Sequence, residues 1–113
     1  LIENSGKRIE GLLTVDTFDE EYRGEMYLRF KKRFIERFGY KPEFAAITGF
    51  ESVMIIKRVI ENGATRHNMK DAILSAGRFE GLQGEIIINK FGDRQIKPFV
   101  VKIENGTFKR MKE

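Results

Sequence analysis

The chain contains no cysteine and only one histidine among its 113 residues. The absence of thiols excludes disulfide bridges, thiolate metal sites and a cysteine nucleophile, and it leaves the cellular compartment open. His67 has no acid–base partner that the sequence identifies, so we expect it to lie at the surface. The serines stand in no nucleophile-elbow context, and no glycine cluster forms a phosphate loop. The sequence therefore predicts a protein that is not an enzyme and that carries no cofactor.

Clustered metal ligands are also scarce. Four carboxylates gather between Asp16 and Glu21, but their spacing does not match a calcium loop, which needs an internal Gly and a terminal Glu. We therefore expect no metal site. Instead, we expect either Asp16 or Asp19 to cap the helix that follows, because carboxylates are favoured near the positive end of a helix.

Proline is scarce too, with two residues, whereas 41% of the chain is hydrophobic and 34% is charged. This composition predicts one small folded domain with a core and argues against disorder. No segment resembles a signal peptide or a membrane span. The chain begins at Leu1 rather than at Met, so we expect it to be a fragment of a longer protein or a processed product.

The net charge is +4, and the segment from Arg23 to Arg37 alone holds six basic and two acidic residues. A basic helix of this kind can bind nucleic acid, and a small nucleic-acid-binding module is one hypothesis. A solvated outer face is the simpler interpretation, because surface Lys and Arg are the norm, and we expect no nucleic-acid partner. The basic residues concerned are Arg29, Lys31, Lys32, Arg33 and Arg37.

The longest helical pattern runs from Pro42 to Gly63. Proline suits the start of a helix because its φ is preset, and glycine suits the end because it adopts the left-handed conformation easily. Apolar positions between them recur at spacings of four, three and four, which predicts a face buried in the core. On this prediction, Val53→Asp places an unpaired charge in the interior and unfolds the domain. The predicted buried positions are Gly49, Val53, Ile56 and Ile60.

Other helical patterns flank this one. From Arg23 to Phe38 an apolar residue recurs at every fourth position, which predicts an aromatic face on the buried side. A shorter helix is expected from Arg66 to Ala76, with Thr65 as its N-cap and Gly77 as its stop. A further helix is expected to end at Asn4-Ser5-Gly6. The aromatic face consists of Met26, Phe30, Phe34 and Phe38.

The remaining patterns are typical of strands. The apolar run Ile9–Val15 predicts a buried strand. Asn105-Gly106 predicts a two-residue hairpin turn, and Pro98 should sit at an edge or a bulge because it lacks an N–H group. We therefore expect an α/β fold in which helices are followed by a small antiparallel meander. Its strands are expected at Gly84–Asn89, Ile96–Ile103 and Thr107–Met111.

Several short motifs occur in an order and at spacings that resemble one family. They are Gly11 in a strand; Phe30-x3-Phe34-x3-Phe38-Gly39-x2-Pro42; Ala45-Ala46 and Gly49-Phe50-Glu51-Ser52; Asp71-Ala72-Ile73; Phe79-x-Gly81-x2-Gly84; Gly92-Asp93; and Asn105-Gly106-x-Phe108. Across nearly the whole chain, this series resembles the C-terminal portion of type I periplasmic or extracellular solute-binding receptors, the substrate-binding proteins of branched-chain amino acid ABC transporters.

The resemblance implies a fragment of a two-lobed periplasmic-binding-protein-like fold, with a small polar ligand held in the cleft. As a single partial domain, residues 1–22 would hold a strand crossing between the lobes, residues 23–76 the helical part and residues 79–113 the closing strands. The implied ligand is a branched-chain amino acid or an amide, the implied partner is a membrane permease, and the implied location is periplasmic or extracellular. The alternative is an extracellular ligand-sensing domain of a signalling receptor.

The same resemblance nominates three ligand-binding residues. Phe50 stands where the family often has a tyrosine that faces the cleft, so the ring is kept and the hydroxyl is lost. Glu51 is expected to reach a ligand amine across the cleft. Phe18 follows the crossing strand and is expected near the hinge. For each residue the competing interpretation is structural: a core ring for Phe50, a solvated carboxylate for Glu51 and a staple of the following helix for Phe18.

Overall fold

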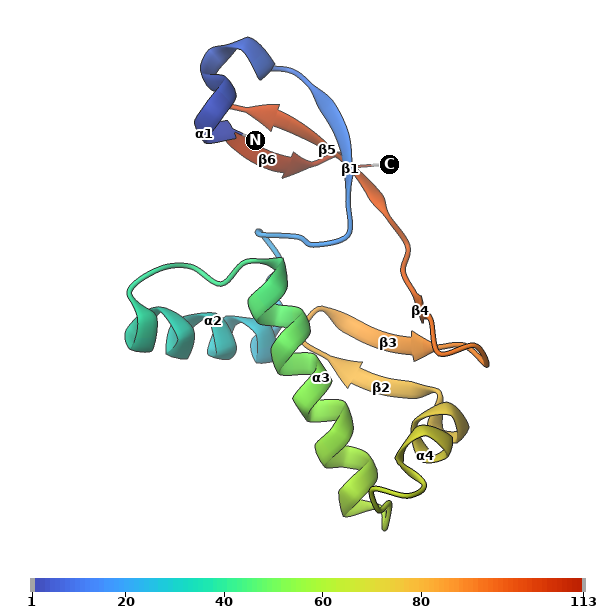
Figure 1. Cartoon of the computed structure of the whole chain (residues 1–113). Coiled ribbons are helices and arrows are strands. Elements are labelled where there is room, and N and C mark those ends of the chain that lie inside the picture. Colours follow the sequence, from blue (N-terminus) through green and yellow to red (C-terminus); the bar gives the residue numbers. More distant parts are fainter. Residues whose placement is uncertain (1, 113) are drawn as a thin grey trace. The chain divides into compact units, whose positions relative to one another are not determined.

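Figure 1 shows the computed structural model of the chain, which describes residues 2–112. The chain divides into two units. Unit 2 is the central part, Arg23–Ile96, and unit 1 combines both ends of the chain, up to Tyr22 and from Lys97 onward. The backbone therefore connects the two units twice, once after Tyr22 and once after Ile96.

Unit 2 consists of three helices and a three-stranded sheet. The strands pair antiparallel in the order β2-β3-β4, with Phe79 opposite Ile86 in the first pair and Ile87 opposite Gln95 in the second. The elements are α2 (Glu25–Phe38), α3 (Phe44–Glu61), α4 (Met69–Ala76), β2 (Arg78–Gly81), β3 (Gly84–Ile88) and β4 (Arg94–Gln95).

The core of unit 2 forms where α3 meets the β2–β3 hairpin. Val59 of α3, Phe79 of β2 and Ile86 of β3 are 3%, 7% and 2% exposed and pack together. Met69 and Ile73 of α4 pack against this cluster from the side. One face of α3 thus contacts both the hairpin and α4, and in Figure 1 the green helix runs beside the two strands.

The face of α3 that the sequence predicted to be buried is exposed, so that prediction is wrong. Val53 is 65%, Ile60 52% and Ile56 43% exposed, and Gly49 is exposed as well. The helix is apolar around most of its circumference, and periodicity then leaves open which face a neighbour covers. Within unit 2 the sheet and α4 cover the side that carries Val59, and the predicted side is left open.

The helix stops are confirmed, whereas the predicted caps at the helix starts are wrong. Gly39 and Gly77 have φ values of 78° and 65° and follow the last residues of α2 and α4. The N-cap of α2 is Gly24, because the carboxylates of Asp16 and Asp19 instead accept hydrogen bonds from the backbone of their own turns. Helix α4 starts later than expected, after Asn68 rather than Thr65, since the Asn68 side chain accepts the Thr65 N–H and closes a turn.

The aromatic face of α2 is only half-buried. Phe30 and Phe34 are intermediate, and Phe38 is 51% exposed. The one fully buried side chain of α2 is Tyr27, at 1% exposure, one position beside the predicted stripe. The stripe packs ring against ring, with centroids 5.8 Å apart for Phe30 and Phe34.

Unit 1 holds a second three-stranded antiparallel sheet, in the order β1-β5-β6. Val101 and Ile103 of its central strand are 2% and 1% exposed. Asn105 and Gly106 both have positive φ, 51° and 71°, as the predicted two-residue hairpin requires. The described elements are α1 (Ile2–Ser5), the 3-10 helix η1 (Gly6–Ile9), β1 (Leu13–Asp16), β5 (Phe99–Glu104) and β6 (Thr107–Arg110).

The antiparallel α/β class is confirmed, but the predicted strands do not form one meander. β5 and β6 pair with β1 from the start of the chain, whereas β2, β3 and β4 form their own sheet. Strand β1 begins at Leu13, later than predicted, and the prediction that it is buried is wrong, since Leu13 and Val15 are 59% and 64% exposed. Pro98 lies directly before β5, so no hydrogen bond of the sheet requires the N–H group that proline lacks.

We expect the two valines of α3 to respond in opposite ways to the same substitution. Val59→Asp places a charge in the core of unit 2 and should lower the free energy of unfolding by more than about 3 kcal/mol. Val53→Asp places the charge on the exposed face and should change it by less than about 1 kcal/mol. Urea unfolding followed by circular dichroism measures both. Equal effects would show that the face of α3 is wrongly assigned.

The exposed carboxylate of Glu104 should titrate below its ordinary range. The Lys102 ammonium, 3.0 Å away, lowers the pKa of Glu104 through a hydrogen bond and its charge, and Lys109 adds to this. A lowered folded-state pKa stabilises the fold above the unfolded pKa, and this contribution is lost as the pH falls through the folded pKa. Carbon-13 NMR titration should show the pKa of Glu104 rising in Lys102→Gln. An unchanged value would contradict the pairing.

Candidate functional site

Glu51 is the only charged residue between Phe44 and Ile56, and it lies buried, at 2% exposure. Its Oε1 accepts a hydrogen bond from the Leu82 N–H at 2.9 Å. Its Oε2 pairs with Nη1 of Arg94 at 2.7 Å. Both oxygens of the carboxylate are thus engaged within unit 2, by the β2–β3 turn and by β4. This arrangement meets the requirement that a buried charge be paired.

Gly81 lets the strand come close to this carboxylate. A Cβ at position 81 would lie 2.7 Å from Oε1 of Glu51 and 2.6 Å from the carbonyl oxygen of Gly84. Real Cβ atoms essentially never come so near, so any side chain here would push the hairpin away from α3. The glycine of the Phe79-x-Gly81-x2-Gly84 motif therefore has a packing role beside Glu51.

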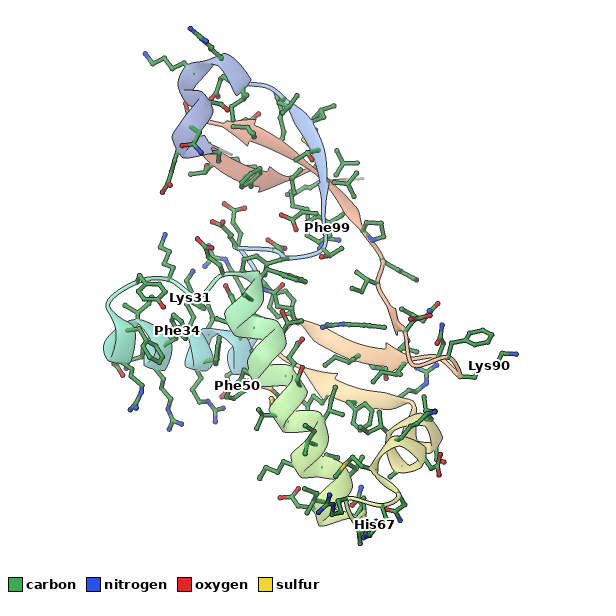
Figure 2. The ribbon with its side chains drawn as sticks, viewed as in Figure 1. Lys31, Phe34, Phe50, His67, Lys90 and Phe99 are labelled. Atoms are coloured by element: carbon green, nitrogen blue, oxygen red, sulfur yellow. The ribbon has the colours of Figure 1, made fainter. Side chains whose placement is uncertain are left out.

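Phe50, the neighbour of Glu51 on α3, points to the other side and lines an open groove. The groove has a volume of about 580 Å³ and lies between α2 and α3. The Phe50 ring is 43% exposed, and its centroid lies 4.7 Å from that of Phe30. Figure 2 labels Phe34 and Phe50 on the two helices. The groove combines an aromatic floor with the basic side chains Arg29, Arg33, Arg37 and Lys57.

Several of the basic residues from the nucleic-acid hypothesis already have partners in unit 2. Arg29 forms a salt bridge with Glu25 at 3.0 Å. Lys31 lies over the ring of Tyr27, and Arg37 over that of Phe38. These contacts are those of an exposed helix face that also packs its side-chain stems against aromatic rings.

Phe18, the third predicted ligand residue, lies in unit 1. It is half-buried, and its N–H donates to Oδ1 of Asp16. The structure thus places Phe50 and Glu51 on one helix but on different sides of it, and Phe18 in the other unit. The ligand roles of all three residues stay predictions.

Unit 1 has a cavity of about 740 Å³ next to the two connections. Asp19 and Glu21 line it from the first connection, and Phe99 lines it from the second. Arg110 and Lys112 add positive charge. Sequence reasoning missed this group, because Asp19 and Glu21 lie more than 70 residues before its other members along the chain. It also missed Arg94, although a lone carboxylate in an apolar helix indicates that a buried partner exists.

In residues 2–112, no group of three or more His, Cys, Asp or Glu side chains is placed to hold a metal ion. Over the same residues, no helix has the length and hydrophobicity needed to span a bilayer.

Solved structures with a similar fold include substrate-binding proteins of ABC transporters. A leucine-binding protein from Thermotoga maritima matches at 24% identity with a TM-score of 0.80, over 98% of this chain and 33% of its own. A substrate-binding protein from Desulfitobacterium hafniense matches at 22% identity with a TM-score of 0.83, over 95% of this chain and 33% of its own. A solute-binding protein from R. palustris, solved with benzoate, matches at 13% identity with a TM-score of 0.78, over 97% of this chain and 31% of its own.

The chain spans about a third of the length of these structures. No protein-family model matches it. The neighbours include a protein from Rhodospirillum rubrum that is named as a branched-chain amino acid ABC transporter. Its name is that of the family that the sequence motifs resemble. The chain therefore has the α/β fold of one part of such a periplasmic binding protein, as the motifs predicted.

Because Glu51 is buried and paired, we expect three substitutions to lower the free energy of unfolding by different amounts. Glu51→Ala leaves Arg94 and the Leu82 N–H without their partner, and should cost about 2–4 kcal/mol, since breaking a buried pair costs more than breaking a surface one. Glu51→Gln keeps an acceptor for Leu82 and should lose less. Glu85→Ala removes the exposed pair with Arg78 and should cost no more than about 1 kcal/mol. Chemical unfolding of the three variants measures this order, and equal losses would contradict it.

Proposed function

We propose that the chain is part of a solute-binding protein that holds a small ligand between two lobes and delivers it to an ABC transporter. The observation that carries this proposal is the match of nearly the whole chain to one third of proteins named as ABC transporter substrate-binding proteins. We further propose that the portion matched is C-terminal, that the protein works outside the cytoplasm, and that it is not an enzyme.

The division into two units supports this proposal. In a hinged receptor, a short stretch of sequence can contribute to both lobes if the backbone crosses the hinge more than once, and this chain connects its units twice. We propose that unit 1 and unit 2 belong to different lobes, and that residues 1–22, 23–76 and 79–113 supply a crossing strand, a helical part and closing strands. Ligand contacts in both lobes would then favour the closed state.

The open face of α3 also supports the proposal. Val53, Ile56 and Ile60 form an exposed apolar stripe, which is unusual for a helix whose opposite face is already in a core. In a complete lobe, further polypeptide would cover this stripe.

The ligand class is proposed from the neighbours. One neighbour was solved with leucine and another with benzoate, both small carboxylates with an apolar body. We propose a ligand of this kind, with a branched-chain amino acid or a related amide foremost, and a membrane permease as the partner. The ring of Phe50 is the proposed apolar contact, with Phe18 and Glu51 as further candidates.

The test is Phe50→Ala in the complete receptor that carries this segment. Removal of an apolar ligand contact should weaken binding about tenfold or more, while the 43% exposure of the ring keeps the stability cost below the ~3–5 kcal/mol of a core phenylalanine. Calorimetry with leucine, isoleucine, valine and benzoate, together with thermal melting, measures both quantities.

Two controls accompany this test. Phe91→Ala removes a ring that is 76% exposed in unit 2 and should leave affinity and melting temperature unchanged. The 113-residue chain alone should give no binding heat, because a cleft without its other wall neither excludes water nor closes. A Phe50→Ala receptor with full affinity and lowered stability would show that the ring is structural. Tight binding by the isolated chain would overturn the two-lobe proposal.

A further inference from the structure

Both connections between the units leave the sheet of unit 1 at the same end. The last residue of β1, Asp16, pairs with the first residue of β5, Phe99. The first connection follows Asp16 and ends at Tyr22, and the second ends at Pro98. The two segments therefore start side by side on neighbouring strands, although 82 positions separate Asp16 from Pro98 along the chain.

Arg110 reaches both segments from the third strand of this sheet. It is the last residue of β6 and lies opposite Val101 of β5, so its side chain is on the same face as that of Phe99. Its guanidinium carbon lies 4.3 Å from the centroid of the Phe99 ring, which Figure 2 labels. Its Nη1 lies 3.7 Å from Oδ2 of Asp19.

Each of these two contacts is made with one of the two connecting segments, near the point where it joins unit 1. Oδ1 of Asp19 accepts the N–H of Glu21 at 3.0 Å, and the Asp19 carbonyl accepts the N–H of Tyr22 at 3.2 Å. Asp19 therefore orders the last turn before the chain leaves unit 1. Phe99 is the first residue of β5, immediately after the second connection. A planar guanidinium suits this double contact, because it stacks on a ring while its edge binds a carboxylate.

The attraction between Arg110 and Asp19 should be stronger than that of an ordinary surface ion pair. The Asp19 side chain is 16% exposed, against 52% for Arg110, so water and salt screen the attraction less on the carboxylate side. Two further salt bridges among the described residues of unit 1, those of Glu104 with Lys102 and Lys109, involve only β5 and β6.

We propose that Arg110 is a positioning residue that ties both connecting segments to the sheet of unit 1. It thereby sets the point at which each segment begins to bend. In a receptor that opens and closes, this point determines how the lobes hinge, and that part of the inference rests on the proposed function. The tie itself depends only on the contacts within unit 1 and can be tested without a ligand.

Amide hydrogen exchange on the 113-residue chain tests the tie. Arg110→Ala should raise the exchange rates of the Glu21, Tyr22, Lys97, Phe99 and Val100 amides about threefold to tenfold. This is the range expected for the loss of an ion pair and a cation–π contact. The Ile103 amide, which donates to the Leu12 carbonyl within the sheet, should keep its rate. Arg110→Lys keeps a cation near the ring and should restore part of the protection, whereas Arg110→Met should not.

Lys109→Ala is the matched control, because Lys109 is the neighbouring cation on β6 and pairs with Glu104. It should leave both connections unchanged. Unchanged exchange at the Glu21, Tyr22, Lys97, Phe99 and Val100 amides in Arg110→Ala would overturn the proposal. A uniform rise that includes Ile103 would also overturn it, since this would show a general loss of stability. In the complete receptor, Arg110→Ala should change ligand affinity. A receptor in which only the exchange rates change would overturn the link to closure, whereas a wild-type receptor that binds no solute would overturn the proposed function and leave the tie intact.

Discussion

The buried carboxylate of Glu51 is the constraint on which unit 2 depends. A charge at 2% exposure is tolerated only when its oxygens are occupied, and here the Leu82 N–H and Arg94 occupy one oxygen each. These two partners hold the β2–β3 turn and β4 against α3. Gly81 has to be a glycine because the strand passes so close to the carboxylate. The hydrophobic cluster of Val59, Phe79 and Ile86 packs the same hairpin against the helix.

Unit 1 depends on a different kind of contact. Its sheet is built from the two ends of the chain, and the strands β1 and β5 leave it together at the Asp16–Phe99 pair. Arg110 places a cation between the segments that follow, with a ring on one side and a half-buried carboxylate on the other. The two connections thus begin at one end of the same small sheet, where a single side chain contacts both.

Sequence reasoning was accurate where the determinants are local. The stops at Gly39 and Gly77 and the turn at Asn105-Gly106 follow from the φ values that these residues adopt, and the motif series correctly indicated the fold of the neighbouring structures. It failed at the starts of the helices: Asp16 and Asp19 close their own turns instead of capping α2, and α4 begins after Asn68 rather than after the predicted cap Thr65. Side chains of Asp and Asn serve either purpose, and the backbone around them selects one.

The sequence by itself determined the type and most ends of the helices, the hairpin turn and the family resemblance, because these depend on residues within a few positions of one another. Only the tertiary structure decided which face of α3 is buried, which strands pair and what Glu51 binds. A helix that is apolar nearly all round presents several equivalent faces, and a strand of alternating residues accepts several partners. The two partners of Glu51 are 31 and 43 residues away from it along the chain. Strand β5 pairs with β1, which comes from the opposite end of the chain. Such partners meet only after the chain has folded, and no local pattern records them.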